Sequence, residues 1–345
     1  DVTNVDSVGL ITARNGIEIG ARPGVAASIS VDGNMIVSGI TTFGGAISGT
    51  TATFSGAISG DGSGLTGVAS TDNIRTNTNA TFLQNINVGV AITAGKLGIG
   101  FTDTNVKVGN TALDSLTTGV QNTSVGQASL TSNTTGSNNS AVGHRALNAN
   151  TTADSNTAVG RDALFTNTTG GENTAVGAFA LDTSNSTGNT AVGNAALTSL
   201  TTGSYNVAVG RNALADQTTA SDNVAIGNKA LESNTTGTNN VAVGANALDA
   251  NTTSSDNTGI GDNALGANTT GAQNTAVGSG SLNANTTASN NTAVGYQALT
   301  TNSTGASNSA LGRRTLRLNT TGNNNVAIGY QALEANTTGY DNIAI

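Results

Sequence analysis

The chain of 345 residues contains no cysteine, no tryptophan, one proline (Pro23) and one histidine (His144), and only 9% of its residues are charged. The absence of cysteine excludes a disulfide framework. The 12 lysines and arginines are scattered and the formal net charge is −8, so no basic stripe predicts nucleic-acid binding. No apolar run approaches the roughly 18 residues that a membrane span needs, and no signal peptide is recognisable.

The chain also lacks the residue groupings that catalysis and cofactor binding require. Residues 62–67 satisfy G-x-G-x-x-G, but no helix is readable after them, so a linker is favoured over a dinucleotide site. The lone His144 has no cysteine or second histidine to complete a zinc site or a catalytic triad, and we expect it to be an exposed loop residue. We therefore predict no enzyme activity, no cofactor and no metal site.

What the sequence has instead is a seventeen-residue unit that repeats from about residue 105 to the last residue. A Val-Gly step places one glycine, here called the turn glycine, in each of the fourteen copies, as at Gly143 and Gly160. The seventeen-residue spacing fails only once, between Gly177 and Gly193, where it is one residue shorter. A fixed short period indicates one structural unit stacked many times. Residues 342–345 match the opening of a fifteenth unit, so we expect the chain to be a segment of a longer protein or a processed one.

The unit reads roughly Asn-Thr-Ala-Val-Gly-x-x-Ala-Leu-x-x-Asn-Thr-Thr-Gly-x-x. Asn stands four residues before the turn glycine and Leu four residues after it in every copy, and an aliphatic residue always precedes the glycine. Two copies illustrate these positions: Asn156, Val159, Gly160 and Leu164, and Asn291, Val294, Gly295 and Leu299. The Thr-Ala-Val alternation predicts a short strand with Thr and Val on one face and Ala on the other.

Each unit is predicted to form one coil of an all-β, parallel β-solenoid, also called a β-roll. Seventeen residues are too few for a helical hairpin repeat, which needs about 34. The turn glycine supplies a positive φ, Asn-Thr-Thr-Gly forms a second turn, and a second short strand holds Ala-Leu. Coils that stack about 4.8 Å apart would make a shaft roughly 65–70 Å long.

The shaft is expected to associate. Columns of Val and of Leu would fill a narrow interior, and a column of Asn would form a ladder of amide hydrogen bonds. Burial of two or three medium-sized side chains per coil gives a small free-energy gain compared with the conformational entropy lost on ordering the whole unit. We infer that chains bury further surface together, most simply as a homotrimer, and the Ala column suits the close approach of neighbours.

Residues 1–104 do not follow the period. Residues 1–70 form a region of short strands, with alternating runs at 16–20 and 28–31 and a turn signal at 32–34. Residues 71–104 are expected to be a transition segment, rich in Asn and Thr over 71–87. Residues 105–345 form the repeat shaft.

Three stretches resemble known families. Residues 60–68, Gly-Asp-Gly-Ser-Gly-Leu-Thr-Gly-Val, resemble a linking motif of bacteriophage tail-fibre and appendage proteins. Residues 1–13 resemble structural proteins of marine phages, notably those of cyanobacteria. The repeat, for example Asn-Thr-Ala-Val-Gly-Tyr-Gln-Ala-Leu at 291–299, resembles the head repeats of YadA-type trimeric autotransporter adhesins and the repeats of many phage fibres.

The resemblance implies a trimer of left-handed parallel β-rolls with a stalk-like N-terminal region. It implies a structural component of a phage tail fibre or virion appendage, with other virion proteins and a host-surface glycan or protein receptor as partners. The alternative is a trimeric autotransporter-type adhesin on a bacterial cell surface. Ice binding is a third class, but the threonines of each Thr-Thr pair are adjacent and point to opposite faces, which disfavours a flat Thr surface.

The two residues after each turn glycine, here called the edge pair, vary from coil to coil. Such mixtures, for example His144-Arg145 and Tyr330-Gln331, require a position that faces solvent. An exposed edge whose residues can change without affecting folding explains this variation without any function. If the segment carries a receptor patch, the candidates are Tyr296, Arg313, Arg314 and Tyr330.

Overall fold

The computed structural model describes residues 17–19, 27–29, 35–37 and 105–345. The features predicted at residues 1–13, 60–68 and 71–104 lie outside them. The described strands are β1 (Ile17–Ile19), β2 (Ala27–Ile29), β3 (Met35–Val37), β4 (Val106–Val108), β5 (Thr123–Val125), β6 (Ser140–Val142), β7 (Thr157–Val159), β8 (Thr174–Val176), β9 (Thr190–Val192), β10 (Val207–Val209), β11 (Val224–Ile226), β12 (Val241–Val243), β13 (Thr258–Ile260), β14 (Thr275–Val277), β15 (Thr292–Val294), β16 (Ser309–Leu311), β17 (Val326–Ile328) and β18 (Ile343–Ala344).

The chain divides into two compact units, Asp1–Ala91 and Ile92–Ile345. In the first unit, β1, β2 and β3 form an antiparallel sheet in the order β1-β2-β3. Ile17 pairs with Ile29, and Ile29 in turn pairs with Met35. Strand β1 lies within the alternating run at residues 16–20, and β2 overlaps the first two residues of the run at 28–31.

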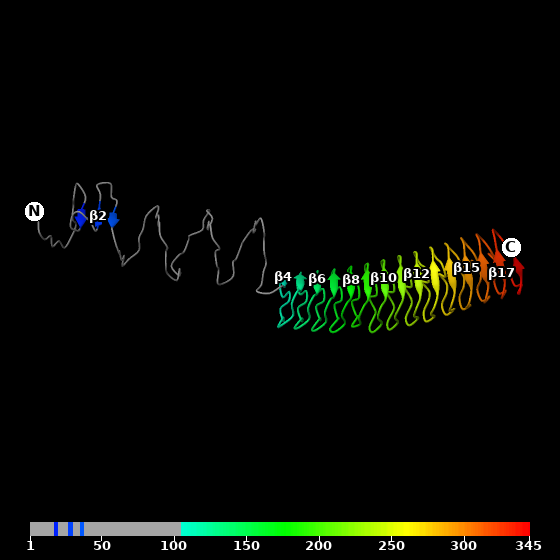
Figure 1. The fold of residues 1–345 in the computed structure, drawn as a ribbon, viewed down its shortest axis with the longest axis horizontal. Helices are drawn as coiled ribbons and strands as arrows, with labels where there is room; N and C mark the ends of the chain where they lie inside the picture. Colours follow the sequence, from blue (N-terminus) through cyan, green and yellow to red (C-terminus); the bar gives the residue numbers. More distant parts are fainter. Residues whose placement is uncertain (1–16, 20–26, 30–34, 38–104) are drawn as a thin grey trace, which may run out of the picture. The chain divides into compact units, whose positions relative to one another are not determined.

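The second unit contains a parallel sheet of 15 strands, β4 to β18, arranged strictly in chain order. Figure 1 shows these strands side by side, one per coil. The register is uniform: Val207, Ala208 and Val209 pair with Val224, Ala225 and Ile226, the residues one coil later. The predicted parallel β-solenoid with one repeat unit per coil is confirmed. Fourteen steps of about 4.8 Å give the sheet a length of roughly 67 Å.

From β5 to β17, each strand turns its central residue inward and its two outer residues outward. Ala158 of β7 is fully buried, whereas Val159 is 37% exposed. Val142 and Ile226, at the same position as Val159, are each 40% exposed. The predicted two-faced strand is confirmed, but the expectation that a Val column fills the interior is wrong. The interior column of the strand is Ala, so it does not mediate the approach of a second chain.

The predicted second strand at Ala-Leu is also wrong. The residues after the turn glycine form a continuous turn, in which Asp162 and Leu164 have φ of 57° and 50°. Gly160 has φ of 136°, and a Cβ placed there would lie 2.5 Å from the carbonyl oxygen of Gly177, so only glycine fits. Leu164 accepts a conformation that is unfavourable for its type because the turn directs its side chain into the interior, where it is fully buried.

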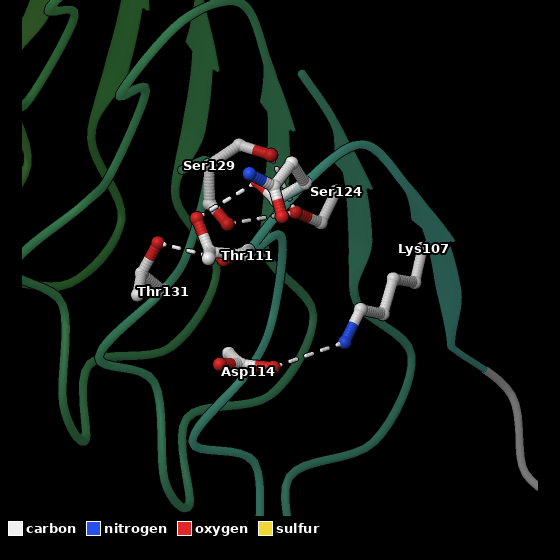
Figure 2. Close-up of polar contacts among 7 residues, drawn as sticks. Lys107, Thr111, Asp114, Ser124, Ser129 and Thr131 are labelled. Atoms are coloured by element: carbon white, nitrogen blue, oxygen red, sulfur yellow. Dashed lines mark hydrogen bonds and ion pairs between the residues drawn. The ribbon is translucent and has the colours of Figure 1, made fainter. Parts of the chain in front are cut away.

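Leu and Ala columns therefore make up the apolar core. Leu147, Leu164 and Leu299 are fully buried, and so is the Ala that precedes each of them. Where serine replaces Ala in both columns of one coil, the two serines pair: Ser124 and Ser129 place their hydroxyl oxygens 2.6 Å apart (Figure 2). Each of these buried hydroxyls has a partner, which removes most of the cost of its desolvation.

The Asn four residues before each turn glycine binds two coils together. Its side-chain Oδ1 accepts the backbone N–H of the corresponding Asn in the next coil at 2.8–3.1 Å, from Asn105 through to Asn342. Its Nδ2 donates to a turn carbonyl of that coil, as from Asn156 to Gly170 and from Asn291 to Gly305, both at 2.9 Å. This column is the predicted ladder, and it joins side chain to backbone in every coil.

A second Asn column was not predicted. The Asn of Asn-Thr-Thr-Gly is buried, and its Nδ2 donates both to a carbonyl of its own turn and to the amide oxygen of the preceding coil. Asn285 donates to Ala288 at 2.9 Å and to Asn268 at 2.8 Å. Asn is replaced by Ser184, Leu200 and Gln217 in three consecutive coils and by Leu116 in the first copy, and of these Gln217 keeps the hydrogen bonds of the column.

The one shortened spacing lies in the coil of Ser184. One residue of the Thr-Thr corner is missing there, and the side chain of Asn185 takes its place. Elsewhere one threonine carbonyl, such as that of Thr151, accepts two backbone N–H groups of the preceding coil. Here Oδ1 of Asn185 accepts those of Thr168 and Thr169, at 3.0 and 2.9 Å. Ser184 pairs with Ser186 and not with the preceding coil, so Oδ1 of the buried Asn167 has no partner.

We predict that the two Asn columns differ in their tolerance of an apolar residue. Asn291→Leu leaves the backbone N–H of Asn308 buried without an acceptor, which costs about 1–3 kcal/mol beyond any change in packing. Asn285→Leu should cost less, because Leu200 already occupies the equivalent position. Unfolding of both variants followed by circular dichroism measures the difference. Equal destabilisation would contradict the assignment of distinct roles.

Candidate functional site

The edge pair follows the turn glycine, and its two members differ in exposure. The first member is exposed in several coils, as at Arg161, Arg211 and Tyr296. The second has a left-handed φ and is partly covered by its neighbours in many coils, and Asp162 is only 3% exposed. The prediction that both members face solvent therefore holds for coils such as that of Tyr296 and is wrong for Asp162.

The residue five positions after the turn glycine leans back toward the preceding coil. Nδ2 of Asn148 donates to the backbone carbonyl of Ala128 at 2.9 Å, and that of Asn283 to the carbonyl of Asn263 at 3.0 Å. The hydroxyl of Thr131 donates to Thr111 in the same way at 2.8 Å (Figure 2). The edge surface is thus built from three side-chain columns that contact one another across coils.

One group of charged and aromatic residues on this surface, here called the Arg/Asp cluster, spans three coils. Nε of Arg145 donates to Oδ1 of Asp162 at 2.7 Å, and Nε of Arg161 lies 3.5 Å from the other carboxylate oxygen. The hydrogen bond to Asp162 raises the pKa of Arg145. Each guanidinium also covers a phenyl ring, that of Phe165 at 4.5 Å and that of Phe179 at 4.4 Å. The cluster therefore satisfies its own charges.

Asp182 lies at the border of the Arg/Asp cluster and is poorly satisfied. Its Oδ1 is buried without a hydrogen-bond partner. Burial, reinforced by the negative charge of Asp162, raises the pKa of Asp182, and Arg145 opposes this only in part. An acid at this position costs stability when it is ionised.

Three of the four predicted receptor residues form a column on consecutive coils, here called the Tyr/Arg column. The guanidinium carbon of Arg313 lies 5.9 Å from the ring centre of Tyr296 and 5.5 Å from that of Tyr330. Both rings are exposed, at 46% and 61%. The fourth residue, Arg314, has a buried Nε without a hydrogen-bond partner. The structure thus brings the three column residues together, with Arg314 next to Arg313 in the chain.

The remaining candidates for chemistry are isolated. His144 is exposed and lies in the turn after β6, in line with the predicted loop position. Within the described ranges, no three residues among His, Cys, Asp and Glu are grouped so that they could hold a metal ion. The same ranges contain no helix of the length and apolarity that a membrane crossing requires.

Comparison with family models, with curated proteins and with solved structures finds no match to this chain.

We predict that Asp182→Asn stabilises the protein at pH 7. The new amide can donate to the backbone carbonyl of Asp162, the bond that Asn148 and Asn283 make at the same position. The folded-state pKa of Asp182 is raised, so ionisation costs stability above it, and this cost disappears as pH falls toward the ordinary Asp value of about 3.9. Because the side chain is only half-buried, the gain should not exceed about 1 kcal/mol.

Thermal unfolding at pH 7 and pH 3 measures this gain, which should be smaller at pH 3. Asp216→Asn, at an exposed position on the same shaft, is the control and should change neither value. A gain of equal size at both pH values would show that the ionisation of Asp182 carries no cost.

Proposed function

We propose that this protein is a non-enzymatic structural component of a phage tail fibre or virion appendage, in which a rigid homotrimeric shaft presents its edges to a host surface. The observation that carries the proposal is the uninterrupted, in-register sheet of 15 strands. Each coil contacts only its neighbours, so the repeat extends in one direction and spans distance at a constant cross-section. The resemblance of the repeat to those of phage fibres supports this choice over the alternative of a bacterial adhesin.

The outer face of the sheet supports self-association. The residue before each turn glycine, here called the outward aliphatic column, is Val, Ile or Leu in every copy. Several of its members are exposed, among them Leu311 at 51%. The other outward column contains only Val, Thr, Ser and Ile, so this face bears no charge between residues 106 and 343.

A long uncharged face of this kind is unusual in contact with water. All-parallel sheets are normally covered on both faces, and extended apolar patches mark interaction sites. Three copies arranged around a common axis would each turn this face inward and cover it along its whole length. We infer that the left-handed, trimeric arrangement implied by the resemblance uses this face.

We predict that Ile226→Asp converts the trimer into monomers. The carboxylate would be buried at the interface without a partner, which costs several kcal/mol. Asn228→Asp is the matched control, because Asn228 belongs to the edge pair of the same coil. Light scattering coupled to size-exclusion chromatography gives the masses. A monomeric parent chain, or a trimer that survives Ile226→Asp, would contradict the proposed interface.

Immunogold electron microscopy tests the function itself. Antibody to the repeat region is applied to purified virions and to uninfected candidate bacteria. We expect gold on tail or neck appendages of the particles. Gold on uninfected cells, together with unlabelled particles, would overturn the phage assignment in favour of a bacterial surface adhesin.

A further inference from the structure

Charge is segregated along the shaft. Residues 105–262 contain five basic and eleven acidic residues, a balance of −6. Residues 263–333 contain no Asp or Glu at all, and their only charged residues are Arg313, Arg314 and Arg317. The Tyr/Arg column lies within this acid-free stretch. An anionic ligand therefore meets a locally positive surface on a chain that is negative as a whole.

The two arginines of one edge pair lack the ion-pair partners that most other described basic residues have. Among the described residues, five of the basic side chains form ion pairs with carboxylates: Lys107, Arg145, Arg161, Lys229 and Arg317. Arg313 and Arg314 form no ion pair within the same part of the chain. The difference arises from the edge pairs of the neighbouring coils, which supply Asp162 beside Arg145 but Gln297 and Gln331 beside Arg314. The acid of the next coil, Glu334, pairs with Arg317 at 2.6 Å.

Arg313 is instead held by the two tyrosine rings. Each lies within about 6 Å of the guanidinium, the range in which a ring attracts a cation without neutralising it. The rings restrain the side chain, and its planar N–H donors remain available to an oxyanion. One cation therefore stands between two exposed aromatic rings, one coil away from each.

We infer that the Tyr/Arg column binds an acidic polysaccharide, a chain of pyranose rings that carries carboxylate or sulfate groups. Arg313 would bind the acidic group with two N–H donors, and Arg314 would add positive charge beside it. Tyr296 and Tyr330 would pack against sugar rings on either side, since aromatic rings offer an apolar face and a polar hydroxyl. The inference rests on the proposed attachment function and specifies the chemistry of the host surface.

The dimensions of the column favour a glycan over a protein. A stable protein partner normally covers about 800 Å² on each side, around an apolar centre. The Tyr/Arg column is one residue wide, and the adjacent second members of the edge pairs are Gln297, Arg314 and Gln331, all polar. A narrow polar strip with separated aromatic rings matches an extended sugar chain, and three copies of it on one trimer would add avidity.

The test measures binding of the full 345-residue chain to three polymers by biolayer interferometry: polygalacturonate, dextran sulfate and uncharged dextran. We expect binding to at least one of the two anionic polymers and none to dextran. Preference between the two separates carboxylate from sulfate recognition. Arg313→Gln should weaken binding at least about tenfold, the loss of one charge-assisted contact. Tyr330→Ala should also weaken it.

Arg211→Gln is the matched control. Arg211 occupies the same edge position, is exposed and has no ion pair among the described residues, but its neighbours in the column are Asn194 and Asn228. It should leave binding within about twofold, because no ring pair positions it. Circular dichroism checks that each variant is folded. An equal loss with Arg211→Gln would overturn the inference in favour of non-specific charge attraction.

Failure of this inference is distinguishable from failure of the proposed function. Gold on virions together with no binding to either anionic polymer overturns the glycan site and leaves the appendage assignment intact. Binding to host cells that protease treatment abolishes would replace the glycan with a protein receptor. Binding to an anionic polymer that Arg313→Gln reduces, with gold only on bacterial cells, supports the site and overturns the phage assignment.

Discussion

The structure depends on backbone hydrogen bonds that run between coils. The N–H of Leu147 donates to the carbonyl of Ala163, and the N–H of Leu164 to the carbonyl of Ala180, both at 3.0 Å. The backbone N–H and C=O groups of each coil therefore find their partners in the adjacent coils. A coil of different height or length would leave buried backbone groups of the next coil unpaired. The two Asn columns extend the same rule to side chains. The interior columns are uniform for this reason. A position in a column accepts only a residue that makes the same hydrogen bonds or an apolar residue that needs no hydrogen bond.

The coil that is one residue shorter shows which departure from the regular hydrogen-bond pattern the structure accommodates. A residue is missing at the Thr-Thr corner, and the side-chain carbonyl of Asn185 accepts the N–H groups that a backbone carbonyl accepts elsewhere. The second Asn column is interrupted there, and Leu200 fills the space two coils after Asn167. The amide oxygen of Asn167 is left unpaired. The side chain of Asn185 thus restores the backbone pattern at the deletion, whereas the replacement of Asn by Ser184 leaves one buried acceptor unpaired.

The period and the uniform composition of each column were enough to predict the solenoid, the turn glycine and the ladder of Asn291 and its equivalents. They were not enough to say which face of a three-residue strand points inward, because Ala and Val are both apolar. Leu164 was expected in a second short strand, but it lies in a turn with φ of 50°, a region that a leucine seldom adopts and that burial of its side chain stabilises here. The regular spacing did place Tyr296, Arg313 and Tyr330 in one column. Their ring–cation contacts depend on rotamers that no sequence pattern specifies.

The edge surface shows why the same solenoid can carry side chains of different chemistry in different coils. The Arg/Asp cluster and the Tyr/Arg column are built on the same edge of the coil, and both place a guanidinium near aromatic rings. In the first, Asp162 stands in the coil after Arg145 and neutralises it at 2.7 Å. In the second, the edge pairs that flank Arg313 and Arg314 contain no acid. Different residues at the edge positions therefore give a self-neutralised cluster at one height and arginines without an ion pair at another, while the interior columns keep the same residue types.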